Sequence, residues 1–165
     1  MKKNGLTIAG MIVILSGAGV LVVTSLIALF SAKNVYLGDD WIFYYYGVHT
    51  SQYDSAAKTL SEVRIALGCL AIFALIVLLF AFKNKKAVAI TGIVLASLSL
   101  YFSLGMLIVC ISAPSNIIGE FVKIDIVWIA LMFIASIALL VGAILKLVGV
   151  NKLNKQLAQQ NTASE

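Results

Sequence analysis

The chain has 165 residues, of which 62% are hydrophobic and only 12% are charged. Soluble domains average about 45–50% apolar and about 25% charged residues, so this composition argues against a water-soluble enzyme or nucleic-acid-binding protein. The formal net charge of +5 is better interpreted by how the lysines divide between two membrane faces. A small multi-pass membrane protein is therefore predicted.

Four charge-free windows are long enough to span a bilayer, which requires about 20 mostly apolar residues. Pro114 ends the third window, because proline terminates a helix. We expect one membrane domain with spans at residues 6–32, 65–82, 87–112 and 126–148. These spans leave outer loops at 33–64 and 113–125, an inner turn at 83–86 and a tail at 149–165. The first window exceeds the apolar core of a secretory signal, about 7–15 residues, so we expect it to remain a span.

The division of basic residues predicts the orientation. With four spans, both termini and the inner turn share one side, which carries eight basic residues and one acidic residue, Glu165. The other side carries four basic and six acidic residues. The positive-inside rule then places both termini in the cytoplasm and the chain in the cell membrane. The basic residues of the predicted cytoplasmic side are Lys2, Lys3, Lys83, Lys85, Lys86, Lys146, Lys152 and Lys155.

Lysines beside a membrane are attracted to anionic lipid headgroups by about 1 kcal/mol each. We expect this contact from five residues, Lys83, Lys85, Lys86, Lys152 and Lys155. Apolar residues at helical spacing also continue past the fourth span, so that helix is predicted to extend to about Gln159.

Small residues recur at helical spacing in three of the windows. Helices in lipid associate through close approach at such residues, and a 3.5-residue period favours left-handed crossings near +20°. An all-α, left-handed, antiparallel four-helix transmembrane bundle is predicted. The residues expected at its helix contacts are Gly10, Gly17 and Thr24; Gly92, Ala96, Ser99 and Ser103; and Ala135, Ala138 and Gly142.

The first outer loop contains an aromatic run that includes Trp41, Phe43, Tyr44, Tyr45 and Tyr46. Trp and Tyr favour the headgroup level of a membrane, and they are also common hot-spot residues of protein interfaces. The run is therefore interpreted either as an anchor or short β element on the outer mouth of the bundle, or as a contact surface for a partner. After it, Asp54 is expected to cap a helix that starts in water at Ser55.

No catalytic residue, cofactor or metal site is predicted. A charge at the bilayer centre costs at least about 2.5–3.5 kcal/mol and is kept mainly for function, and the four spans hold none away from their ends. The outer-loop residues Asp39, Asp40, His49 and Asp54 match no metal-ligand spacing. Cys69 and Cys110 are expected at similar depth, where two thiols are favoured over a disulfide.

Cytoplasmic termini, a large first outer loop and a smaller second loop are similar to the claudin and tetraspanin topology. The claudin loop motif is missing, because this loop has Trp41 but no cysteine. With its Gly-rich first helix and Lys-rich turn at Lys83–Lys86, the chain more closely resembles uncharacterised four-span membrane proteins of Gram-positive bacteria and mollicutes. This resemblance covers the whole chain and implies no particular activity.

Three functional hypotheses follow. The first is a non-enzymatic accessory or scaffold subunit that contacts lipids and a protein partner, in the membrane or on the outer face, or self-associates; no nucleic acid is expected. The second is a protective protein, such as an immunity factor against a bacteriocin or toxin. The third is an oligomeric pore or carrier for an uncharged or lipid-like solute.

Overall fold

The computed structural model describes residues 4–31, 33–34, 51–112, 117–118, 122–123 and 126–162. Within these ranges the chain forms four long helices, all of them long and apolar enough to cross a membrane. The predicted multi-pass, helical membrane fold is thereby confirmed. The helices are α1 (Gly5–Ser31), α3 (Ser51–Phe80), α4 (Lys86–Ser112) and α5 (Ile126–Thr162).

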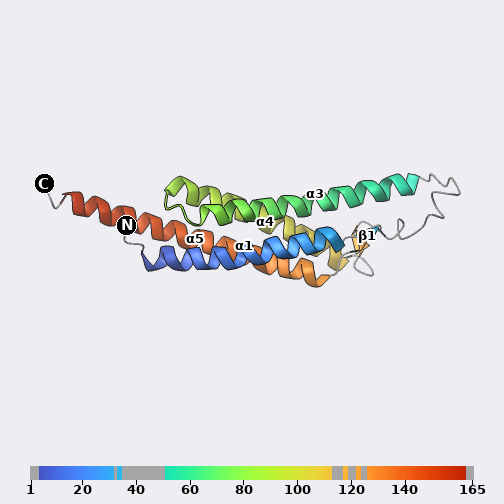
Figure 1. Ribbon diagram of the computed structural model, residues 1–165, viewed down its shortest axis with the longest axis horizontal. Coiled ribbons are helices and arrows are strands. Elements are labelled where there is room, and N and C mark those ends of the chain that lie inside the picture. The colour runs from blue at the N-terminus through green and yellow to red at the C-terminus, as the bar shows by residue number, and fades with distance from the viewer. Residues whose placement is uncertain are drawn as a thin grey trace.

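The helices form a four-membered ring in which each one packs beside its neighbour along the chain. The contact between α1 and α5 closes this ring and is the most extensive of the four, whereas that between α3 and α4 is the least extensive. The N-terminus, the C-terminus and the α3–α4 turn lie at the same end of the bundle (Figure 1). The handedness of the helix crossings stays a prediction.

Two helices extend past the others, at opposite ends of the bundle (Figure 1). At 1.5 Å per residue, the 37 residues of α5 and the 30 of α3 span about 55 and 45 Å, more than a hydrocarbon core of about 30 Å. The α5 helix ends at Thr162, three residues beyond the expected Gln159. The prediction that Asp54 caps α3 is wrong, because the helix already begins at Ser51; no Gly or Pro interrupts the intervening residues.

A small antiparallel sheet joins the two loops at the end opposite the termini. Its three strands, each of two residues, are β1 (Lys33–Asn34), β2 (Ile117–Ile118) and β3 (Val122–Lys123). The strand order is β1-β3-β2, with Lys33 opposite Lys123 and Ile118 opposite Val122. The sheet therefore ties the segment that follows α1 to the segment between α4 and α5. The aromatic run at 41–46 lies outside the described residues.

The interior of the bundle is filled by large apolar side chains. The fully buried ones include Leu21, Leu67, Leu70, Ile129, Met132 and Leu139. Large apolar side chains also cover the outside, and they include Phe30, Leu79 and Ile134, which are exposed by 82%, 64% and 61%. Such a surface is stable only against lipid or another apolar surface, which agrees with four membrane-spanning helices.

Candidate functional site

The contact between α1 and α5 brings the two backbones together at glycines. A Cβ atom on Gly10 would lie 2.6 Å from the backbone nitrogen of Lys146 and 2.9 Å from the carbonyl oxygen of Gly142. In return, a Cβ atom on Gly142 would lie 2.8 Å from the backbone nitrogen of Ile14. Side chains do not tolerate such distances to backbone atoms, so any larger residue at Gly10 or Gly142 would push the helices apart.

The same close approach continues in both directions along the two helices. A Cβ atom on Gly17 would lie 2.9 Å from the backbone nitrogen of Leu139, and one on Gly149 would lie 2.6 Å from that of Thr7. Each step toward the C-terminus of α1 is thus matched by an equal step toward the N-terminus of α5, as an antiparallel pair requires. We call this glycine-lined contact, from Thr7–Gly149 to Gly17–Leu139, the α1–α5 seam.

The small and polar residues predicted beside these glycines also lie at the helix contacts. Thr24 is buried and donates a hydrogen bond to the carbonyl of Val20 at 2.8 Å. Its neighbour Ser25 donates to the sulfur of Met132 on α5 at 3.4 Å. Ala135 is buried, and the side chain of Ala138 would lie 3.3 Å from a Cβ atom on Gly17. Gly10, Gly17, Ala135, Ala138 and Gly142 are therefore brought together in one contact, whereas the hydrogen bonds of Thr24 stay within α1.

The predicted residues of α4 behave differently from one another. Ala96, Ser99 and Ser103 are completely buried. The hydroxyl of Ser136 on α5 donates to the carbonyl of Met132 at 2.8 Å and lies 3.5 Å from the carbonyl oxygen of Ser99. Gly92 is buried too, but a Cβ atom there would meet no described heavy atom within 4 Å. The packing at Gly92 consequently does not require a glycine.

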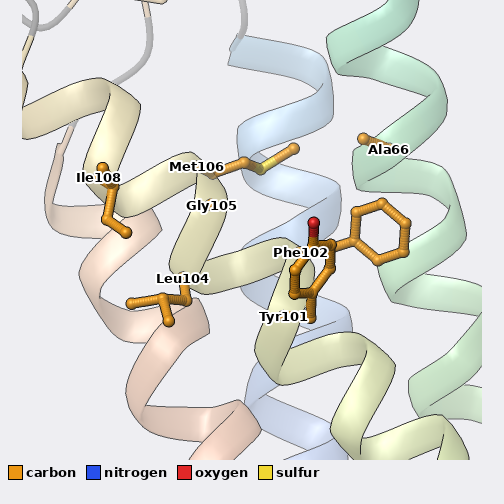
Figure 2. A pocket seen from close by; sticks show the side chains of 7 residues that line it. All are labelled: Ala66, Tyr101, Phe102, Leu104, Gly105, Met106 and Ile108. Atoms are coloured by element: carbon orange, nitrogen blue, oxygen red, sulfur yellow. The ribbon is translucent and has the colours of Figure 1, made fainter.

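An apolar groove opens between α3 and α4 (Figure 2). All but one of its lining residues lie in the second half of α4, which leads toward the sheet. Its volume is about 440 Å³. The Tyr101 ring is exposed by 73% and packs edge-on against Phe102 at 5.9 Å between ring centroids. Phe102 also contacts Phe73 on α3, at 6.5 Å. The lining residues are Ala66, Tyr101, Phe102, Leu104, Gly105, Met106 and Ile108.

The groove is shaped by small residues flanked by large ones. Figure 2 shows Ala66 on α3 facing α4 across the opening, with Gly105 between Tyr101 and Ile108 on α4. A Cβ atom on Gly105 would meet no described atom within 4 Å, so open space lies above this glycine. The groove can therefore take an apolar side chain or hydrocarbon chain from outside the bundle.

A lysine lies buried at the end of the bundle that carries the termini. Sequence analysis counted Lys146 among the basic residues of the predicted cytoplasmic side, within the fourth span. Its side chain is only 2% exposed, and its Nζ donates a hydrogen bond to the carbonyl oxygen of Phe80 at the end of α3. Lys146 lies on the packed face of α5, where its backbone nitrogen approaches Gly10, and the helix continues past it to Thr162. The spacing Gly142–Lys146–Gly149 was a sequence signal for this position.

The five lysines predicted to contact lipid headgroups are all exposed, in contrast to Lys146. Lys83, Lys85 and Lys86 form the α3–α4 turn and the start of α4, and the ammonium of Lys83 lies 6.0 Å from the centre of the Phe80 ring. Lys152 and Lys155 lie on α5 beyond Gly149, where the helix makes its last close approach to α1. Lys83 and Lys146 thus both contact Phe80 at the end of α3, Lys83 from the solvent side and Lys146 from the interior.

Among the described residues, no three His, Cys, Asp or Glu side chains gather as metal ligands would. Cys69 and Cys110 are thiols and not a disulfide. Lys58 and Glu62 form an exposed ion pair at 4.0 Å where the α3 span begins, at Ser61. Trp41, Phe43, Tyr44, Tyr45 and Tyr46, and also Asp39, Asp40 and His49, lie outside the described residues.

Comparisons with protein-family models, with curated proteins and with solved structures found no match to this chain.

Proposed function

We propose that this chain is a non-enzymatic protein of the cell membrane that acts through contacts, as an accessory or scaffold subunit. The observation that carries the proposal is the apolar groove between α3 and α4. In lipid, van der Waals contact with small residues is a main source of affinity between helices, and the open surface at Gly105 offers it to a partner. The filled interior supports contact rather than conduction, because the large buried side chains occupy the space between the helices.

Photo-crosslinking tests this proposal directly. A photoreactive residue replaces Ile108, which lines the groove and is 55% exposed, in the full chain in its own membrane. The matched control replaces Ile12 on α1, which is 58% exposed and lies outside the groove. We expect one defined protein adduct from position 108, none from position 12, and loss of the adduct when Gly105→Trp fills the groove.

Other outcomes would replace the proposal. Equal adducts from both positions would show that the groove selects no partner. Solute flux through liposomes that contain only the purified chain would favour an oligomeric carrier. Sensitivity of cells to a secreted toxin after deletion of the chain, without a crosslinked partner, would favour a protective role.

The aromatic run supplies a second contact in this proposal, on the outer face. Replacement of Trp41 and Tyr44–Tyr46 by serine is expected to abolish partner capture while the helices stay folded. Capture that is unchanged, measured by detergent pull-down with mass spectrometry, would leave the run as a membrane anchor only.

The proposed orientation places both termini and the α3–α4 turn in the cytoplasm, from the excess of lysines there. It is tested with single cysteines in a chain whose Cys69 and Cys110 are replaced by alanine. A membrane-impermeant thiol reagent should label Lys58→Cys in intact cells, since that side chain is 78% exposed, and should label Lys86→Cys only after lysis. The reverse pattern would invert the orientation.

A further inference from the structure

The end of α3 gathers two lysines around one carbonyl group. The carbonyl oxygen of Phe80 accepts a hydrogen bond from the backbone nitrogen of Lys83 at 3.1 Å and another from Nζ of Lys146. An ammonium group carries three protons, and in the described part of the chain this carbonyl is the one acceptor of Lys146 Nζ. Lys146 as a whole is 2% exposed and its hydrogen bond to Phe80 is partly buried, so its ammonium group lies just beneath the surface at this end of the bundle.

The start of α4 follows directly after this turn, and its first backbone N–H groups also lack a hydrogen-bond acceptor. The first turn of a helix leaves backbone N–H groups without partners in the helix, and here the first bonded nitrogen is that of Ala89, which donates to the carbonyl of Lys85. The first turn of α4 contains no acidic residue. Lys85 immediately precedes α4 and Lys86 begins it, at the end where the helix dipole disfavours cations. An anion bound there would interact favourably both with these lysines and with the N-terminal end of the helix dipole.

The charge around this end of the bundle is all of one sign in the described residues. Lys83, Lys85 and Lys86 are exposed, and no Asp or Glu occurs in the nearby segments 4–10, 80–90 and 142–162. Phosphate is the anion that matches lysine ammonium groups together with the backbone N–H groups of a helix start.

The position of these groups relative to the membrane identifies the source of the phosphate. Phe80 is the last residue of the α3 span and Lys86 is the first of the α4 span, so the turn between them lies at the headgroup level. Leu79 and Phe82, exposed by 64% and 60%, present apolar side chains beside the turn. A phospholipid would place its phosphate on the lysines and its acyl chains along these residues. Basic pockets between helix ends on the cytoplasmic side are known to recognise anionic lipids in this way.

We propose that the α3–α4 turn and Lys146 hold the phosphate group of one anionic phospholipid. Lys83 and the first N–H groups of α4 bind the phosphate from the turn, and Lys146 contributes an N–H from beneath it while it remains bonded to Phe80. This site differs from general attraction by surface lysines, because it depends on one buried residue. Its assignment to the cytoplasmic leaflet follows the proposed orientation, whereas its preference for an anionic headgroup does not.

Native mass spectrometry of the full chain tests the site, with phosphatidylglycerol as the anionic probe and phosphatidylcholine as the neutral one. We expect a single retained phosphatidylglycerol and no retained phosphatidylcholine. Lys146→Met and, separately, Lys83→Ala should each lower the retained fraction by tenfold or more. The matched control is Lys152→Met on the free part of α5, where the loss of one surface lysine should weaken binding by about fivefold at most.

Each other outcome overturns the proposal. Equal losses from Lys83→Ala and Lys152→Met would show that only diffuse surface charge attracts the lipid. Equal retention of the two lipids would show that the contact is apolar. Displacement of the lipid by millimolar glycerol phosphate, together with lipid retention that does not depend on acyl-chain length, would identify a site for a soluble phosphate compound. Lys83 is exposed, so Lys83→Ala remains a valid test even if Lys146→Met lowers the folded yield.

Discussion

The α1–α5 and α3–α4 pairs of the bundle pack in different ways. At the α1–α5 seam, glycines bring the two backbones so close that a single added carbon would lie under 3 Å from a backbone atom at Gly10, Gly17, Gly142 and Gly149. Between α3 and α4, aromatic rings hold the helices together and a groove stays open beside them. The small residues of the α1–α5 pair are covered by the neighbouring helix, whereas Ala66 and Gly105 of the α3–α4 pair line the open groove.

This difference teaches that a small residue in a membrane helix has two distinct uses. Gly10 and Gly142 are needed because another backbone occupies the space of their missing side chains. Gly105 and Gly68 have no described atom within 4 Å of a Cβ position, so nothing in the described part of the chain requires them to be small. Substitutions at these two kinds of glycine should therefore separate the folding of the bundle from the binding of its partners.

The largest effect is expected from a bulky residue in the seam. Gly142→Leu would drive a side chain into the backbone of α1 at Ile14 and separate the helices. Overpacking commonly costs about 1–3 kcal/mol, and a backbone clash costs more, so the yield of folded protein in detergent should fall several-fold. Gly17→Leu should act in the same way, whereas Gly105→Leu should leave the yield unchanged. Equal yields from all three variants would contradict the distinction.

Alanine gives a finer version of the same test. Gly10→Ala should lower the free energy of unfolding by about 1–3 kcal/mol, because the new Cβ would lie 2.6 Å from the backbone nitrogen of Lys146. Gly68→Ala lies in open space within α3 and should raise stability by about 0.5–1 kcal/mol through helix propensity. Unfolding in mixed micelles, followed by circular dichroism, measures both. A loss of stability at Gly68 equal to that at Gly10 would show that distance to the neighbouring backbone is not what matters.

A gain of stability is expected where the seam buries a hydroxyl group. Thr7 is 2% exposed, and its Oγ1 has no hydrogen-bond partner among the described residues. Thr7→Val keeps the shape of the side chain and removes the unpaired group, so the free energy of unfolding should rise by about 1 kcal/mol. The same micelle unfolding experiment measures the change. A loss of stability would indicate that the hydroxyl binds a group from outside the chain.

The smallest effect is expected at the α4–α5 contact. The hydroxyl of Ser136 has a bond within its own helix and only a long one, 3.5 Å, to Ser99 on α4. Hydrogen bonds between membrane helices contribute about 0.6 kcal/mol on average, so Ser136→Ala should cost no more than about that amount. A cost above that of Gly10→Ala would show that polar contacts, and not the seam, dominate the stability of the bundle.

The sequence was sufficient to predict the helices because the bilayer limits the choices. Charged residues at Lys33, Arg64, Lys83 and Lys86 interrupt apolar windows whose lengths match a membrane, and helices of that length follow. The spacing of Gly10, Gly17 and Gly142 also predicted that these residues lie at helix contacts. Sequence spacing did not specify which helix each of them meets, since an α1 stripe can pack equally well on any small-residue stripe.

Two features could not be predicted from spacing alone, for different physical reasons. Gly92 shares the pattern of its neighbours, but a Cβ atom there would meet no described atom within 4 Å, so no neighbouring helix comes close at that level. Lys146 carries a charge that suggests water, yet a long side chain can bury its stem and bring only its tip to a carbonyl group. Both outcomes depend on the distances between helices, which arise only when the whole bundle is assembled.

The closure of the ring by α1 and α5 has a consequence for the order of assembly during synthesis. Translation produces α1 before α3 and α4, and α5 after them, so the glycine face of α1 has no permanent partner while the intervening helices are inserted into the bilayer. A ribosome adds about 5–20 residues per second, which leaves α1 in that state for several seconds. During this interval the glycine face of α1 is free to associate with helices of other newly made chains. Packing of α5 on α1 then covers that face.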